Sequence, residues 1–192
     1  MAKRVILAGI VGGILMFNWG FLTHMVLPFG ELGVRKLPDE PSVFAPIRST
    51  VKEPGFYVFP AMDMNAPESE REACLEKAKQ GPIGVLIVKP QGSEIVLPKL
   101  LLNELATNMT SALLAALFLS QLRAGARYWT RVGLVTLLGL FALVTVDFPY
   151  WNWYSFPAEF VASEAVEHIV GWFLVGLALA AIVRAPLAPA AE

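Results

Sequence analysis

The chain has 192 residues, of which 56% are hydrophobic and 16% are charged, with 15 Lys plus Arg against 16 Asp plus Glu. Soluble domains are on average roughly 45–50% apolar and about 25% charged, so this composition is typical of a membrane protein. The net charge of −1, without a basic run, excludes nucleic acid from the expected partners. The single cysteine excludes an intrachain disulfide and a cysteine-based zinc site.

The first apolar segment, Val5 to Leu27, is long enough to cross a bilayer, because about 20 apolar residues suffice for a helix. Basic residues precede it, as in a secretory signal. However, the run is longer than a signal core of roughly 7–15 residues and lacks a small-residue cleavage site. We therefore interpret residues 1–27 as a retained N-terminal transmembrane helix. Within it, Gly9 and Gly13 form a small-residue motif that predicts close packing against a neighbouring helix.

Three further spans are predicted in the second half of the chain, at residues 100–122, at 132–146 extended by its aromatic exit, and at 160–183. An aromatic run, 148–157, joins the last two. Its Trp and Tyr residues are typical of headgroup depth, with an aromatic ligand or lipid site as the alternative. The predicted fold class is mainly α: a four-helix transmembrane bundle in which residues 100–184 form a three-helix region and residues 185–192 a disordered tail.

Basic residues indicate the orientation of the spans. With four crossings, six basic positions fall on one side, which the positive-inside rule assigns to the cytoplasm: Lys3, Arg4, Arg123, Arg127, Arg131 and Arg184. We therefore expect cytoplasmic N and C termini, residues 28–99 outside the cytoplasm, and a location in the bacterial inner (plasma) membrane.

The region between the first and second spans, residues 28–99, is predicted to form a small α/β extracytoplasmic cap. Asp39 as N-cap indicates one helix, and Asn65 as N-cap, with Pro67 just inside, indicates another. The expected elements are helices ending near residues 50 and 80 and strands at 56–59 and 83–89. So small a cap buries little core, and we expect it to lean on the bundle or on a partner.

Cys74 lies in the middle of the second predicted helix of the cap. A free cysteine at such a position is typically a small buried hydrophobe, and we expect this environment for it. A reactive or cross-linked thiol is the alternative.

Three segments, taken in their order along the chain, carry a resemblance to a known family. They are Glu53-Pro-Gly-Phe-Tyr-Val-Phe-Pro60, Gly81-Pro-Ile-Gly-Val-Leu-Ile-Val88 and Asp147-Phe-Pro-Tyr-Trp-Asn-Trp-Tyr154. This order resembles a family of small bacterial four-span membrane proteins without assigned activity, over most of the chain. The resemblance implies a four-span fold with an outer cap and supplies no catalytic residue.

Polar residues of the spans are expected to gather in the outer leaflet, because the inner halves contain no ionisable residue. On spans two and four they recur three, four and seven residues apart, so each set shares one helix face. A charge that faces lipid costs at least a few kcal/mol, so these faces should meet one another or a wet cavity. The predicted cluster comprises His24, Glu104, Asn108, Asp147, Glu164, Glu167 and His168.

Several functions are open to this cluster. A hydrogen-bonded polar core would fix helix register and dock the cap. A metal site would take zinc, iron or copper, and haem ligation by the two histidines or proton and quinone chemistry are further alternatives. The metal ligands would be His24, Glu104, Glu164 and His168.

No nucleotide-binding loop or nucleophile elbow is present in the sequence, and we assign no catalytic residue. We predict a polytopic, non-enzymatic accessory, structural or assembly subunit of a larger membrane complex. Its partners are the lipid bilayer and other membrane protein subunits. The alternatives are a metal- or quinone-dependent membrane enzyme that uses the outer-leaflet cluster and a small ion-coupled carrier. The cofactors left open are a metal ion, a quinone and a haem.

Overall fold

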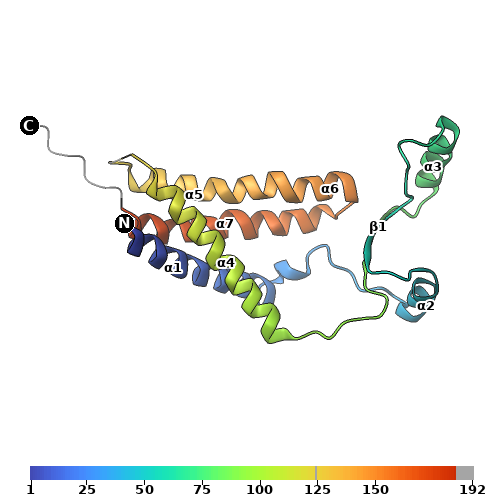
Figure 1. Ribbon diagram of the computed structural model, residues 1–192, viewed down its shortest axis with the longest axis horizontal. Coiled ribbons are helices and arrows are strands. Elements are labelled where there is room, and N and C mark those ends of the chain that lie inside the picture. The colour runs from blue at the N-terminus through green and yellow to red at the C-terminus, as the bar shows by residue number, and fades with distance from the viewer. Residues whose placement is uncertain (124, 185–192) are drawn as a thin grey trace, which may run out of the picture. The chain divides into compact units, whose positions relative to one another are not determined.

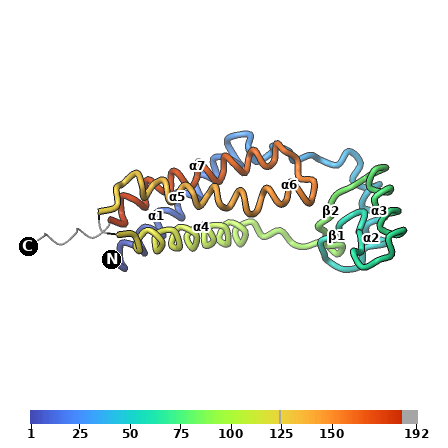
Figure 2. The backbone as a smooth tube through the Cα atoms, turned by 90° about the horizontal axis from the view of Figure 1, so that it is seen from above, coloured from blue at the N-terminus to red at the C-terminus, as the bar shows by residue number. Residues whose placement is uncertain are grey.

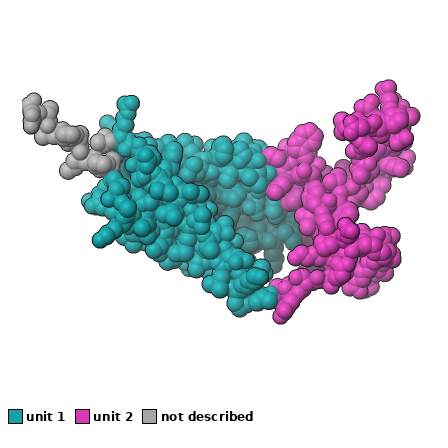
Figure 3. Space-filling model, viewed as in Figure 1, with its two compact units in different colours: residues 1–34, 96–148, 158–192 teal, residues 35–95, 149–157 magenta. Residues whose placement is uncertain are grey.

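The computed structural model describes residues 1–123 and 125–184, so the predicted tail at 185–192 lies outside the described residues. The chain is mainly helical with a small two-stranded sheet. It separates into two compact units (Figure 3). Unit 1 contains residues 1–34, 96–148 and the segment from Ala158 onward, and unit 2 contains residues 35–95 and 149–157.

Four helices among the described residues are long and apolar enough to cross a membrane, as the hydropathy pattern predicts. They cover Ala2–Val26, Leu97–Ser120, Tyr128–Tyr154 and Ala158–Ile182. The first consists of α1 (Ala2–Phe21) and the π-helical turn η1 (Leu22–Val26), and the second is α4 (Leu97–Ser120). The third consists of α5 (Tyr128–Ala142), the π-helical turn η3 (Leu143–Asp147) and α6 (Phe148–Tyr154), and the fourth is α7 (Ala158–Ile182).

The third helix begins four residues before the predicted span and continues through most of the aromatic run as α6, where the sequence predicts an extension. Pro149 lacks a backbone N–H and its ring opposes the carbonyl four residues earlier, which normally ends or kinks a helix. Here the π-helical turn η3 comes directly before it, and such a turn alters the local hydrogen-bond ladder. The helix ends only before Ser155, which has a positive φ of 60°.

Unit 1 is a row of helices in which α1 packs against α4 and α7, and α7 also packs against α5 (Figures 1 and 2). The core at the α1–α4–α7 contact is built largely from Ala and Val. Gly9 allows this approach, because a Cβ there would lie 2.9 Å from that of Leu113. At Gly12 a Cβ would lie 2.9 Å from that of Ala112 and 2.6 Å from Leu179 Cδ1. The predicted close packing of the first span is therefore confirmed.

Unit 2 contains α2 (Glu40–Thr50), β1 (Gly55–Phe59), α3 (Glu68–Gln80) and β2 (Gly84–Val88). The two strands are antiparallel, with Gly55 opposite Val88 and Phe59 opposite Gly84. Tyr154, at the end of α6, meets Phe56 edge to face with ring centroids 5.1 Å apart. These elements agree with the predicted helices and strands to within one or two residues.

Two local predictions for unit 2 concern helix caps. Asp39 is the N-cap of α2 as predicted, and its side chain accepts a hydrogen bond from the Ser42 backbone N–H at 3.4 Å. The N-cap of α3 is Pro67, so the prediction of Asn65 is wrong. The backbone N–H of Asn65 instead donates to Asp63 Oδ1 at 2.8 Å, which places Asn65 in the turn before the helix.

Cys74 differs from its predicted burial. The residue is half-buried, and its Sγ contacts the Ala61 carbonyl oxygen at 3.6 Å. The physical reason is the size of the unit, because none of its described residues is fully buried. A helix of this unit has no deep core in which to place an apolar side chain.

Candidate functional site

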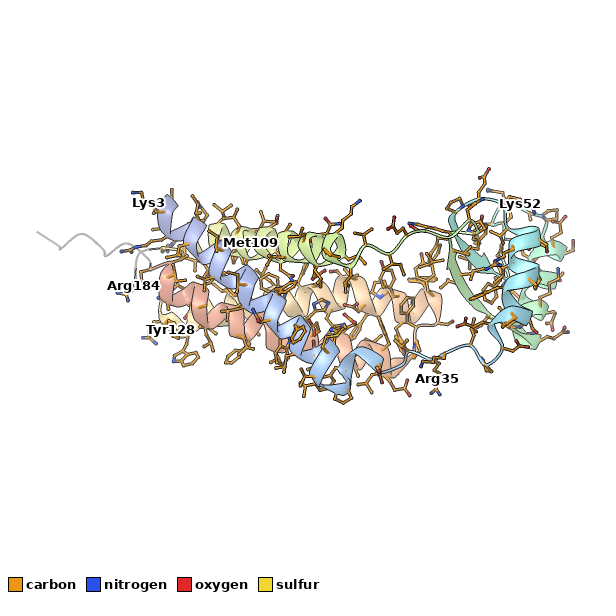
Figure 4. All side chains as sticks on the ribbon, turned by 90° about the horizontal axis from the view of Figure 1, so that it is seen from below. Lys3, Arg35, Lys52, Met109, Tyr128 and Arg184 are labelled. Atoms are coloured by element: carbon orange, nitrogen blue, oxygen red, sulfur yellow. The ribbon has the colours of Figure 1, made fainter. Side chains whose placement is uncertain are left out.

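Unit 1 has a basic end, where Figure 4 shows Lys3, Tyr128 and Arg184 together. Tyr128 donates its hydroxyl to the Leu177 carbonyl at 2.9 Å. Arg131 is 8% exposed, and its Nη1 donates to the carbonyl of Val183. These two bonds fix the start of α5 against the end of α7. The polar group described next lies away from this end, since the 14 residues from His168 to Ile182, where α7 ends, correspond to about 21 Å of helix.

Asp147, Glu164 and His168 meet where η3 packs against α7. His168 Nε2 lies 3.2 Å from Asp147 Oδ2 and 3.9 Å from Glu164 Oε2. One ligand atom from each of the three side chains lies within 4.8 Å of the others. Asp147 is 6% exposed, and the side chains of His168 and Glu164 are 27% and 23% exposed. The group is therefore buried on one side and open on the other.

The buried oxygen of Asp147 is short of a partner. Oδ2 is inaccessible to solvent and accepts no hydrogen bond. This oxygen is close enough to His168 Nε2 for an ion pair, but the two atoms do not have the relative orientation of a hydrogen bond. A buried carboxylate oxygen in this state is costly and calls for a positive or proton-bearing neighbour.

A second set of polar contacts joins η1 to α7 around Glu167. Thr23 is fully buried, and its hydroxyl donates to Glu167 Oε2 at 2.5 Å. Trp19 Nε1 donates to the backbone carbonyl of Glu167 at 3.2 Å. A small cavity of about 30 Å³ lies beside these contacts, and the polar residues that line it are His24, Ser163, Glu164 and Glu167. A space of this size is suited to a single water molecule.

The structure brings five of the seven predicted cluster residues to this region and places the other two elsewhere. Glu104 is exposed on α4, and its Oε1 accepts a hydrogen bond from Asn108 Nδ2 at 3.0 Å. The reason is that α4 packs along α1 and has little contact with α7, and Figure 1 shows the Leu97 end of α4 apart from α7. The predicted four ligands are therefore not gathered at one point.

The group contains Asp147 and neither Glu104 nor His24 of the predicted ligand set; His24 lies instead at the small cavity beside Glu167. The sequence places Asp147 in the polar cluster, but spacing along one helix does not show which neighbour it meets. Thr23 is absent from the predicted cluster. Its position three residues after Gly20 could have indicated this contact, because residues three apart share a helix face. Gly20 itself approaches Glu167, since a Cβ there would lie 3.2 Å from Glu167 Oε1.

The donor set of one imidazole and two carboxylates offers mixed nitrogen and oxygen ligands. Such a set suits zinc and other divalent first-row metals rather than the thiolate-bound ions. Comparison with known proteins adds no relative, because no family model, curated protein or solved structure matches the chain.

Proposed function

We propose that the protein is a multi-pass protein of the bacterial inner membrane, with both termini in the cytoplasm and residues 28–99 on the outer side. Support comes from the surface of the four long helices, because only 17% to 28% of the apolar stretch of each helix is buried inside the protein. The remaining apolar surface matches the requirement of helices that face lipid. The basic end of unit 1 supports this orientation through the positive-inside rule.

Within that membrane, the protein acts as a non-enzymatic accessory or assembly subunit of a larger complex. The observation that carries this proposal is an apolar groove of about 460 Å³ between α5 and α7. Gly133 lies in the groove with open space around it, and Thr136 lies one turn further along. Small residues at such positions let another helix approach closely. The groove is lined by Trp129, Val132, Gly133, Thr136, Leu137, Leu140, Ile169 and Phe173.

The occupant of the groove is a transmembrane helix of another subunit. The groove combines small residues with exposed large ones, since Trp129 is 66% and Leu137 is 55% exposed. This alternation of large and small side chains is complementary to the side-chain ridges of another helix, and helix association in membranes depends on such packing. Unit 2 has no fully buried residue among those described, so a partner surface would also supply burial there. In this account the contacts of Glu167 and His168 hold η1, η3 and α7 in register.

Filling the groove tests this proposal. Gly133→Trp puts a large side chain into open space, because no neighbouring atom lies within 4 Å of the position that a Cβ would take, and the fold itself is expected to tolerate it. A photoreactive residue at Leu137 should cross-link to a discrete partner helix in intact membranes. Gly133→Trp should lower that cross-linked fraction by about tenfold, which corresponds to roughly 1.4 kcal/mol of lost association energy.

Gly133→Ala is the matched control and should leave the cross-link intact. The same photoreactive residue at Leu114, which is 61% exposed on α4, shows the background from lipid. Equal labelling at Leu137 and Leu114, insensitive to Gly133→Trp, would mean that lipid fills the groove and would contradict the proposal.

A further inference from the structure

Among the described residues, the carboxylates around His168 have no Lys or Arg as a partner. Asp147 and Glu164 each approach His168. Glu167 adds a third carboxylate on the same helix, and its side chain is held by the neutral hydroxyl of Thr23. Buried charge without a counter-ion costs several kcal/mol, and a bound cation would offset this cost.

The distances within the group are close to those between ligands that share one ion. Two atoms that each lie about 2.0–2.2 Å from a tetrahedral zinc ion are roughly 3.3–3.6 Å apart. His168 Nε2 lies 3.2 Å from Asp147 Oδ2 and 3.9 Å from Glu164 Oε2, values on either side of this range. The oxygen of Asp147 that approaches His168 is also the buried oxygen that accepts no hydrogen bond. Its lone pairs therefore remain available to a metal.

The scaffold holds the ligands from two directions. Glu164 and His168 are four residues apart and share one face of α7. Gly139 of α5 lies against the backbone carbonyl of His168, where a Cβ would collide with it. This close contact brings the following turn, η3, to α7 and sets Asp147 opposite the other two ligands.

We propose that Asp147, Glu164 and His168 bind a divalent first-row transition-metal ion, with zinc as the ion that fits this ligand set. Three protein ligands leave a coordination position open, which is the arrangement of zinc sites that accept water or a small ligand. Glu164 also borders the small cavity beside His24 and Glu167, which has room for one water molecule. This site goes beyond the accessory role proposed above and does not depend on it.

The test uses the purified full-length protein in detergent, stripped with a chelator and then equilibrated with Zn²⁺ alone. Elemental analysis should give one zinc per chain. Glu164→Gln and Asp147→Asn should each weaken zinc binding by more than about tenfold, because each removes a ligand charge. His168→Gln should do the same, and Co²⁺ in place of zinc should give a d–d absorption band that this variant loses.

Matched controls come from neighbouring positions of the same chemistry. Glu167→Gln and His24→Asn leave the three ligands in place and should retain zinc. Circular dichroism and the elution volume identify any variant that fails to fold. Glu164→Gln carries the lowest such risk, because the side chain is partly exposed and its contact with His168 is long, at 3.9 Å. Absence of zinc from the folded wild-type protein would overturn the proposal. Equal losses in Glu167→Gln and Glu164→Gln, or Mg²⁺ that displaces zinc at equal concentration, would also overturn it.

Discussion

Replacing His168 with leucine is expected to lower the free energy of unfolding of the metal-free protein by about 3 kcal/mol. The substitution removes the one side chain that forms an ion pair with the buried carboxylate of Asp147 within the described residues. Breaking a buried pair costs roughly 3–5 kcal/mol because a charge is left uncompensated, and the lower value applies since His168 is 27% exposed. Unfolding in mixed micelles at increasing denaturing detergent measures the change.

The double variant Asp147→Leu with His168→Leu separates lost pairing from lost packing. Replacing both partners by apolar residues of similar size is often close to neutral, so the double variant should recover most of the lost stability. If the single and double variants are equally unstable, or if His168→Leu costs less than about 1 kcal/mol, the buried pair does not hold η3 to α7.

The second large effect is expected at the contact between α1 and its neighbours. Gly12→Leu introduces a side chain where even a Cβ would lie 2.6 Å from Leu179 Cδ1 and 2.9 Å from Ala112 Cβ. Overpacking of this kind costs about 1–3 kcal/mol, more than the gain of roughly 0.8–1.0 kcal/mol from removing a glycine within a helix. The same unfolding measurement in micelles should show a net loss of stability and a lower melting temperature.

Gly133→Leu is the matched control for Gly12→Leu, because it places the same side chain on α5 in open space. It should leave stability unchanged or raise it slightly through helix propensity. Equal destabilisation by the two substitutions would show that α1 does not pack through its glycines, against the arrangement described above.

The helices can be predicted from the sequence because each depends on local information. Long apolar runs predict the four candidate spans, and Asp39 with Gly81 marks helix ends in unit 2. The predicted cap of α3 is wrong because Asn65 and Pro67 are both acceptable near a helix start, and only the backbone of the preceding turn decides between them.

The candidate site is only partly predictable, for a different reason. Helical spacing shows that Glu164 and His168 share a face, but it does not show which helix covers that face. That neighbour is determined by packing. The glycines of α1 let α4 approach closely, and Glu104 is then on an exposed surface. Gly139 of α5 lets α7 approach closely, which brings Asp147 to His168. The sequence therefore predicts the polar residues well and their partners poorly.

The most direct test of the proposed membrane topology determines on which side of the membrane each end of α4 lies. In a Cys74→Ser background, Ser93→Cys and Gln121→Cys each provide one exposed thiol, the first before α4 and the second at its basic end. A membrane-impermeant maleimide added to intact spheroplasts should label Ser93→Cys, whereas Gln121→Cys should react only after lysis. Labelling of Gln121→Cys in intact spheroplasts, with Ser93→Cys protected until lysis, would contradict the orientation, and labelling of both thiols in intact spheroplasts would contradict the crossing by α4.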